Sequence, residues 1–403
     1  RGDRVIIYDK GCSFLPHYFD EKKDRILNPF DKRCVQWDLW SDANQIEEFE
    51  FISQALIPLG DSENPFWINS ARSLLTDTAN RMKNDSDRSI NNLLKMLLTA
   101  DLDTIAQYLT GTESANLVDS KIEKTAITIK SVLATYLKSL RFLNGLATER
   151  FSIKEFIEND ENGSLFITSN AKYHTSIRSL ISMWISIASN TLLSMEENRD
   201  RRIWFVLDEL PSLQQINSLP GTLAECRKFG GSFILGMQSQ SQLKKIYGHN
   251  GAAEINDLLN TRFFFRSPSA DMAKYVSNEI GDHDIEELRE NYSYGANTVR
   301  DGISLSKQKS TKPIVSASEV MSLPDLSCFL KMSKLPTTRL YLNLKVDRSK
   351  IAEYLVPRKI NLDTEVEELI DQYVAQAPKD IQNDNKEAIQ KTNDSFQMEG
   401  DDF

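Results

Sequence analysis

Apolar residues along the 403-residue chain follow two patterns, short continuous runs and stripes at helical spacing. Residues 4–8 read Arg-Val-Ile-Ile-Tyr and end at the polar turn Asp9-Lys10-Gly11. A short β-branched run that ends in a polar loop is typical of a buried parallel strand. Similar runs predict further strands at 164–168, 202–207, 232–236 and 261–265. Because strands that alternate with helices form parallel βαβ units, we expect an α/β core.

A different pattern occupies residues 42–150, where glycine is rare and apolar residues recur at the spacing of an amphipathic helix. The stripe formed by Ile129, Leu133, Tyr136, Leu137 and Leu140 is an example, because these positions share one face of a helix. About 100 residues of this kind is enough for a separate domain. We therefore predict an all-α insertion at 42–150 that divides an α/β domain made of residues 1–41 and 151–361.

The C-terminal part of the chain holds a predicted hairpin and most of the charge. Residues 328–332 and 338–344 are apolar runs joined by a short link, which predicts an edge hairpin. Residues 362–403 carry 12 acidic residues and 3 lysines, so the net charge of −10 belongs mainly to this tail. We expect a short amphipathic helix at 366–373, followed by largely disordered acidic sequence. An acidic total therefore does not argue against nucleic-acid binding by the body.

Composition argues against several classes of protein. No run approaches the roughly 18 apolar residues of a membrane span, and the charged start does not resemble a signal peptide. The four cysteines are widely spaced, and the four histidines lack metal-binding spacing, which argues against a disulfide framework or a zinc site. The chain begins at Arg1, almost directly with a strand, so we expect it to be a fragment of a longer protein.

The clearest chemical pattern is an apolar strand that ends in two carboxylates, Asp208 and Glu209. This is the Walker B arrangement of ATPases, and nucleotides bind at the carboxyl ends of buried parallel strands. Asp208 is suited to hold Mg²⁺, and Glu209 to act as general base toward an attacking water. The alternative is a strand end that carries ordinary solvated acids.

Two later residues strengthen the ATPase interpretation. Gln238 ends the strand expected beside the Asp208 strand, where its amide can contact both a γ-phosphate and the attacking water. Arg227 ends a helix just before that strand, although basic residues near a helix C-terminus are also ordinary capping.

Six sequence blocks occur in an order that resembles the TraD/TrwB-type coupling proteins of conjugative type IV secretion. They are RGDRVIIYDKGCSF, ILNPFDKRCVQWDLW, ENPFWINSARSLLTDTA, IWFVLDELPSL, AECRKFGGSFILGMQSQSQL and SLPDLSCFLKM. The resemblance extends over residues 1–346. It implies a RecA-like P-loop NTPase core that carries an inserted all-α domain.

The resemblance also implies a function, that of an ATP-driven hexameric translocase linking the relaxosome to the secretion channel. Its cofactors would be ATP and Mg²⁺, with Asp208 and Glu209 as Walker B residues, Gln238 as sensor and Arg227 as a finger toward the neighbouring subunit. Such a finger is worth roughly 10³–10⁵ in rate. Asp9 and Lys10 would lie near the nucleotide base or ribose, with a charged turn as the alternative.

The partners implied are single- and double-stranded DNA, the relaxase, a ribbon-helix-helix accessory protein and the secretion channel. The acidic end, Asp401, Asp402 and Phe403, would dock the accessory protein, or would simply aid solubility. Lys307, Lys309 and Lys312, expected in a Ser/Thr-rich loop, would either line a DNA pore or be solvated. The family lies at the cytoplasmic face of the bacterial inner membrane, held by a region upstream of this sequence.

One family feature is absent from these residues. No GxxxxGK[ST] occurs anywhere in the printed sequence, so we expect this fragment by itself to bind ATP poorly and to be inactive. Two other functions stay open. One is a channel-assembly ATPase that needs no DNA, and the other is a non-catalytic relaxosome adaptor that has lost ATPase activity.

Overall fold

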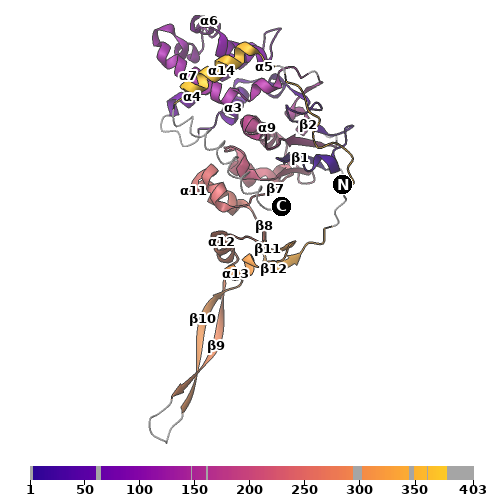
Figure 1. Ribbon diagram of the computed structural model, residues 1–403, viewed down its shortest axis with the longest axis vertical. Helices are drawn as coiled ribbons and strands as arrows, with labels where there is room; N and C mark the ends of the chain where they lie inside the picture. The colour runs from indigo at the N-terminus through magenta and orange to yellow at the C-terminus, as the bar shows by residue number, and fades with distance from the viewer. Residues whose placement is uncertain are drawn as a thin grey trace. The chain divides into compact units, whose positions relative to one another are not determined.

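A computed structural model describes residues 3–59, 65–146, 148–159, 162–293, 302–344, 349–360 and 362–378. The chain forms two compact units (Figure 1). Residues 1–255 and 348–403 make up the first, and residues 256–347 make up the second.

The first unit is built on a five-stranded parallel sheet in the order β2-β5-β1-β6-β7. Its strands are β1 (Arg4–Asp9), β2 (Arg25–Leu27), β5 (Ser164–Thr168), β6 (Ile203–Leu207) and β7 (Gly231–Leu235). Apolar side chains of the central strands, such as Ile6, Phe166 and Phe205, are completely buried, which is why these strands read as continuous apolar runs. The predicted α/β core is confirmed.

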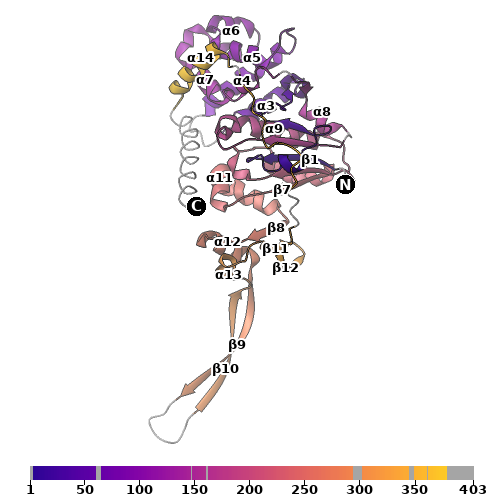
Figure 2. The ribbon, with the colours of Figure 1, turned by 45° about the vertical axis from the view of Figure 1, so that its right-hand side comes forward.

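Helices cover the sheet, and α9 (His174–Ser194) lies along one of its faces (Figure 2). Its long apolar sequence reflects this position, because Ile181, Trp184 and Ile185 are all fully buried. Shorter elements complete the unit around the sheet. They are α1 (Leu15–Tyr18), α8 (Ile153–Glu158), η5 (Leu210–Ser212), α10 (Leu219–Glu225), η6 (Cys226–Phe229) and α11 (Gln240–Leu258), the last of which runs into the second unit.

A block of helices interrupts the sheet between β2 and β5. It contains α2 (Leu39–Asp42), α3 (Ile46–Leu56), α4 (Pro65–Met82), α5 (Ile90–Leu94), η1 (Lys95–Thr99), α6 (Leu102–Tyr108), η2 (Glu113–Val118), η3 (Ser120–Ile122), α7 (Glu123–Leu137) and η4 (Leu140–Leu143). The predicted stripe is buried apart from Tyr136, which is half-buried, but α7 ends at Leu137 and Leu140 belongs to η4. The short strands β3 (Gln36–Trp37) and β4 (Arg150–Phe151) pair in parallel, so the two ends of the block lie side by side.

The acidic segment that begins at residue 362 starts with a packed helix. α14 (Thr364–Gln376) lies against α7, with Val366 and Ile370 almost fully buried. Two ion pairs flank this contact, Lys95 with Asp363 at 2.9 Å and Arg141 with Glu367 at 3.0 Å. The predicted amphipathic helix is confirmed. Asp401, Asp402 and Phe403 lie outside the described residues, so the expectation for them stays a prediction.

The second unit contains a three-stranded antiparallel sheet in the order β12-β11-β8. Its strands are β8 (Thr261–Phe265), β11 (Ser327–Met332) and β12 (Leu335–Tyr341), covered by α12 (Ala270–Ile280) and α13 (Ala317–Met321). The predicted edge hairpin of β11 and β12 is confirmed. The prediction that residues 261–265 extend the parallel sheet is wrong, because β8 pairs antiparallel with β11. Phe264 is buried while Phe263 and Phe265 are half-exposed, as expected for a sheet with one solvated face.

A long hairpin extends from the second unit (Figure 1). We call it the arm, and it consists of β9 (Asp282–Ser293) and β10 (Gly302–Pro313), which pair antiparallel along their whole length. Lys307, Lys309 and Lys312 lie on β10, so the expectation that they occupy a loop is wrong. Polar Ser, Thr and Lys residues mask the strand pattern there. No helix among the described residues is both long and apolar enough to cross a membrane.

Candidate functional site

Five of the predicted site residues gather at the carboxyl edge of the parallel sheet. β6 lies between β1 and β7, and the registers pair Tyr8 with Leu207 and Leu207 with Leu235. The residues that follow these three strands therefore leave the sheet at the same edge. This brings together Asp9, Lys10, Asp208, Glu209 and Gln238.

The backbone after β6 holds the two acids in a tight turn. The Asp208 amide donates to the carbonyl of Tyr8 at 3.2 Å, and the Leu210 amide donates to the carbonyl of Gly236 at 2.9 Å. Glu209 between them adopts the left-handed conformation, with φ 60° and ψ 55°. A non-glycine residue in this region costs on the order of 1 kcal/mol and persists only where its surroundings impose it. Neighbouring strands thus fix the direction in which the turn presents its carboxylates.

The turn requires glycine at position 236, because Asp208 and Glu209 leave no room there for a side chain. A Cβ at position 236 would lie 3.1 Å from Asp208 Oδ1 and 3.3 Å from the Glu209 amide nitrogen. These distances are shorter than ordinary van der Waals contact, so a larger residue would displace the acids. The role of Gly236 was not predicted. Its position two residues before Gln238, at the end of an apolar run, is the signal that marks it.

The two carboxylates are held where their charge is costly. Partial burial raises the pKa of Asp208, and the nearby charge of Asp9 raises it further. Burial also raises the pKa of Glu209, while the charge of Lys10 and a hydrogen bond from the Gln238 side chain lower it. Gln238 therefore contacts Glu209.

The chemistry of these residues fits a bound magnesium ion. Mg²⁺ prefers oxygen ligands and is typically bound through one or two carboxylates together with phosphates and water. The Asp208 side chain is exposed at the sheet edge, so it is accessible to such an ion. A cation there would also offset the repulsion between Asp208 and Asp9.

Asp9 itself has a structural function in this arrangement. Its carboxylate is completely buried and accepts hydrogen bonds from the Gly11 amide at 3.2 Å, the Ser13 hydroxyl at 3.1 Å and the Phe14 amide at 2.7 Å. These contacts hold the turn after β1. They favour the charged-turn alternative for Asp9, and its contact with a nucleotide stays a prediction.

A buried network that sequence reasoning missed anchors the segment after Glu209. The Tyr8 hydroxyl lies 2.6 Å from the Ser212 hydroxyl. His174 donates through Nε2 to the Ser212 carbonyl at 2.9 Å and accepts through Nδ1 from the Ser169 hydroxyl at 2.8 Å. Burial lowers the His174 pKa to about 4, which keeps the ring neutral. No local sequence signal joins residues this far apart.

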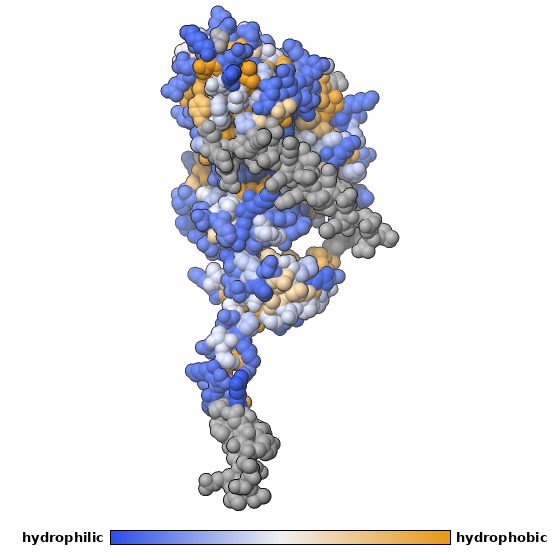
Figure 3. Space-filling view, turned by 60° about the vertical axis from the view of Figure 1, so that its left-hand side comes forward, coloured by the Kyte–Doolittle hydropathy of each residue, from blue (hydrophilic) through white to orange (hydrophobic). Residues whose placement is uncertain are grey.

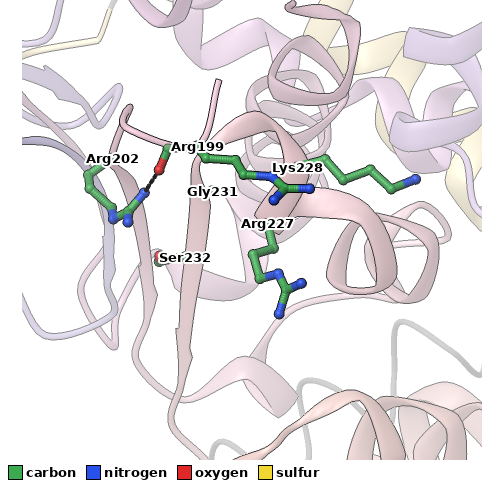
Figure 4. A pocket seen from close by; sticks show the side chains of 6 residues that line it. All are labelled: Arg199, Arg202, Arg227, Lys228, Gly231 and Ser232. Carbon is green, nitrogen blue, oxygen red and sulfur yellow. Dashed lines mark hydrogen bonds between the residues drawn. The ribbon is translucent and has the colours of Figure 1, made fainter. Parts of the chain in front are cut away.

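Arg227 lies at the opposite, amino edge of the sheet (Figure 4). With Lys228, just before β7, and with Arg199 and Arg202, just before β6, it lines a pocket of about 340 Å³. Among the described residues, no hydrogen bond or ion pair involves the Arg227 side chain. A five-residue strand is roughly 16 Å long. Arg227 is therefore separated from Asp208 of its own chain by the length of β7.

Of the basic residues that line this pocket, only Arg227 was predicted as a site residue from the sequence. A cluster of arginines at 199, 201 and 202 precedes β6, just as Arg227 and Lys228 precede β7. Neighbouring parallel strands begin at the same edge, so this repetition is the signal that could have found the pocket. Arg202 Nη1 donates to the Arg199 carbonyl at 2.6 Å, which holds the two arginines beside each other.

The fold and the carboxyl-edge acids define the class of RecA-like P-loop NTPases that carry an all-α domain. The structure matches the bacterial conjugative coupling protein TrwBdeltaN70 in an unbound form with a TM-score of 0.78 and 25% identity, covering 89% of this chain and 82% of that one. TrwB in complex with ADP and Mg²⁺ matches with a TM-score of 0.76 at the same identity and coverage. The predicted fold class is confirmed.

Sequence comparisons identify the family. The family model described as the type IV secretion-system coupling protein DNA-binding domain matches residues 1–343. The coupling protein TraD of Escherichia coli strain K12 is 44% identical over 372 residues, which cover 91% of this chain. This chain belongs to the type IV secretion-system coupling protein family, so the resemblance seen in the sequence is confirmed. The matched region spans 52% of TraD, about half the length of that relative.

Proposed function

We propose that this chain is part of the motor of a conjugative coupling protein, an ATP-driven DNA translocase that links the relaxosome to the type IV secretion channel. The observation that carries the proposal is the side-by-side position of Asp208, Glu209 and Gln238 at the carboxyl edge of the parallel sheet. Family membership supports the DNA substrate and the secretion partner. The bound ADP and Mg²⁺ of TrwB support ATP and Mg²⁺ as cofactors.

Each residue at this edge has a distinct task in the proposed reaction. Mg²⁺, when bound, neutralises charge on the β- and γ-phosphates. Asp208 supplies a carboxylate oxygen to hold it. Glu209 accepts a proton from the attacking water, and its raised pKa brings it closer to the working pH of a general base. Gln238 orients the same water through its contact with Glu209, and Lys10 keeps that carboxylate ionised.

Arg227 acts in trans in this proposal. Because it lies at the amino edge of the sheet, a nucleotide at the carboxyl edge of its own chain is out of its reach. A neighbouring copy that places its carboxyl edge against this amino edge would bring its phosphates to Arg227. The positive pocket around Arg227 is suited to such an anion. Repetition of this contact gives a closed ring where its rotation closes after a whole number of copies, and we propose that it closes as a homo-hexamer.

The phosphate cradle of this motor is proposed to come from sequence outside the printed 403 residues, together with the membrane region that places the protein at the cytoplasmic face of the inner membrane. The first test is to sequence the DNA upstream of the Arg1 codon. An in-frame GxxxxGK[ST] there is expected. Unrelated sequence upstream would contradict the enzyme function and favour a relaxosome adaptor, for which the acidic C-terminus would be the docking site.

The second test uses the longer protein. We expect its ATPase to be stimulated by single-stranded DNA and to fall at least 10²-fold in Asp208→Ala and Glu209→Gln, because both remove groups that act in the transition state. Glu254→Ala, an exposed acid on α11, is the matched control and should keep the wild-type rate. ATP hydrolysis that is independent of DNA would favour a channel-assembly ATPase. Conjugative DNA transfer at the wild-type level by Asp208→Ala would favour the non-catalytic relaxosome adaptor.

A further inference from the structure

The arm combines an acidic strand with a basic one. Its described side chains belong to residues 282–289 on β9 and 307–313 on β10, which pair from Asp282 with Pro313 to Leu288 with Lys307. The β9 part carries four acids and one arginine, whereas the β10 part carries three lysines and no acid. Within one arm the two strands therefore attract each other. Thr311 Oγ1 donates to Asp284 Oδ1 at 2.9 Å, and Lys312 forms an ion pair with Glu287.

The described side chains of the arm form no hydrophobic core of their own. None of the side chains described in it is buried, and Leu288 has 66% of its surface exposed. Figure 3 shows the described part of the arm as mostly hydrophilic, with little apolar surface. A two-stranded hairpin that lacks a packed face is at best marginally stable in water. A hairpin of this length is therefore expected to gain stability from a further partner.

Both outer edges of the arm are available for strand pairing. Within the described part of the second unit, β9 and β10 form a sheet of two strands only, so neither has a neighbour on its outer side. Such edges present rows of backbone donors and acceptors to any chain that can approach. The two edges differ in charge, because one belongs to the acidic strand and the other to the basic strand.

We propose that the arm pairs edge to edge with the arm of a second copy of this chain, with β9 of one copy beside β10 of the next. Charge complementarity selects this arrangement, because opposite charges on neighbouring strands attract and like charges repel. A two-fold contact of β9 with β9 would place Glu286 and Glu287 of both copies together. A contact of β10 with β10 would do the same for Lys307 and Lys309.

The resulting contact is heterologous, since each copy offers one edge to one neighbour and the other edge to the next. Repeated contacts of this kind either close into a ring or continue as a filament. A DNA-binding role fits the charges less well, since the β9 acids offset the β10 lysines within the same arm. The proposal concerns the second unit only and does not depend on the nucleotide chemistry proposed above.

The test exchanges the charges of the two strands. The variant D284K/E286K/E287K/K307E/K309E/K312E retains attraction within each arm, because both strands change sign together. We expect it to assemble with itself as the wild type does. Mixed with wild type, it should form few or no joint assemblies in which β9 of one copy lies beside β10 of the other, because like charges then face each other across that contact. Two differently tagged 403-residue chains are mixed at low salt, and joint species are counted by native mass spectrometry.

A matched control exchanges a charge pair elsewhere in the same unit. Arg266 and Asp325 form an exposed ion pair at 2.7 Å, so R266D/D325R preserves the pair and should mix freely with wild type. Joint assemblies of wild type and the exchanged arm at the control level would overturn the proposal, as would a wild-type chain that stays monomeric. The proposal would also be overturned if the exchanged arm mixed freely with wild type but was no longer retained on single-stranded DNA. That result would show that the arm binds nucleic acid.

A second measurement covers the case in which the exchanged arm fails to fold. Chains carrying only Glu286→Cys are mixed with chains carrying only Lys309→Cys and are then oxidised. The four native cysteines are buried and therefore contribute little. We expect disulfides between the two kinds of chain to exceed those within each kind by several-fold, because β9 lies beside β10. A yield of mixed disulfide no more than twice the yield of either like disulfide, which is the value for random pairing of an equal mixture, would contradict the arrangement.

Discussion

At the scale of single residues, Asp208 and Glu209 at the carboxyl edge lie where burial disfavours their charged form. Burial raises the pKa of Asp208 and Glu209, so their negative charge at neutral pH is destabilising for the folded chain. Their positions are maintained by contacts that carry no charge, namely the backbone of Tyr8 and Gly236 and the neutral ring of His174. The site therefore depends on a buried histidine that must stay unprotonated.

His174 makes the stability of the first unit sensitive to acid. Its folded pKa of about 4 lies below the ordinary value of 6.5. The stability that it contributes is fully present above pH 6.5 and is lost as the pH falls toward 4, because the unfolded chain takes up the proton first. We expect the advantage of wild type over His174→Gln, measured by denaturant unfolding at pH 7.5, to shrink by about 2 kcal/mol at pH 5.

The control for this prediction is His249→Gln, because His249 is exposed. Its difference from wild type should stay constant between pH 7.5 and pH 5. A His174→Gln difference that is equally constant would show that the buried ring carries no proton-linked stability. The Tyr8–Ser212 contact would then be the main anchor of the turn.

At the scale of elements, α14, the last described helix, packs against the helical block. Ile370 is 1% exposed against α7, and Lys130 lies 5.5 Å from the centre of the Tyr373 ring. We expect Ile370→Asp to release α14, because burying an unpaired carboxylate is costly. Hydrogen exchange should then speed up in α7 and stay unchanged in β6. Glu368→Ala, an exposed change on the same helix, should leave exchange in α7 at the wild-type rate.

Elements buried on both faces were predictable from the sequence, and elements stabilised by charge or by distant partners were not. β1, β5, β6 and β7 read as apolar runs, so the sheet and the Asp208, Glu209 and Gln238 cluster followed from strand order. The apolar residues of the arm are few and scattered among polar ones, so its strands resemble a polar loop. They are Ile285, Leu288, Tyr292, Ile303 and Leu305. β8 has a strand sequence, but pairing with β11 depends on residues more than 60 positions away. The His174–Ser212 contact is hidden for the same reason.

At the scale of the whole molecule, the sheet separates two charged edges that are suited to complement each other between copies. The carboxyl edge holds Asp208 and Glu209, and the amino edge holds Arg227 within a basic pocket. An arginine on the same side as the acids would act within one chain. One on the opposite side would need a neighbour, so under the proposed function the activity would be a property of the assembly.

This separation predicts complementation between two inactive variants of the longer protein. Arg227→Ala removes the finger and should lower the ATPase rate by about 10³-fold or more. Glu209→Gln removes the base and should lower it by at least about 10²-fold, and nucleotide binding should persist in both. Mixed in equal amounts before assembly, they should regain activity, because roughly one interface in four then joins an intact Arg227 to an intact Glu209. A chain with both substitutions supplies the background rate. A mixture no more active than its separate components would show that Arg227 serves its own chain or none, since only a residue acting in trans can be supplied by a neighbour.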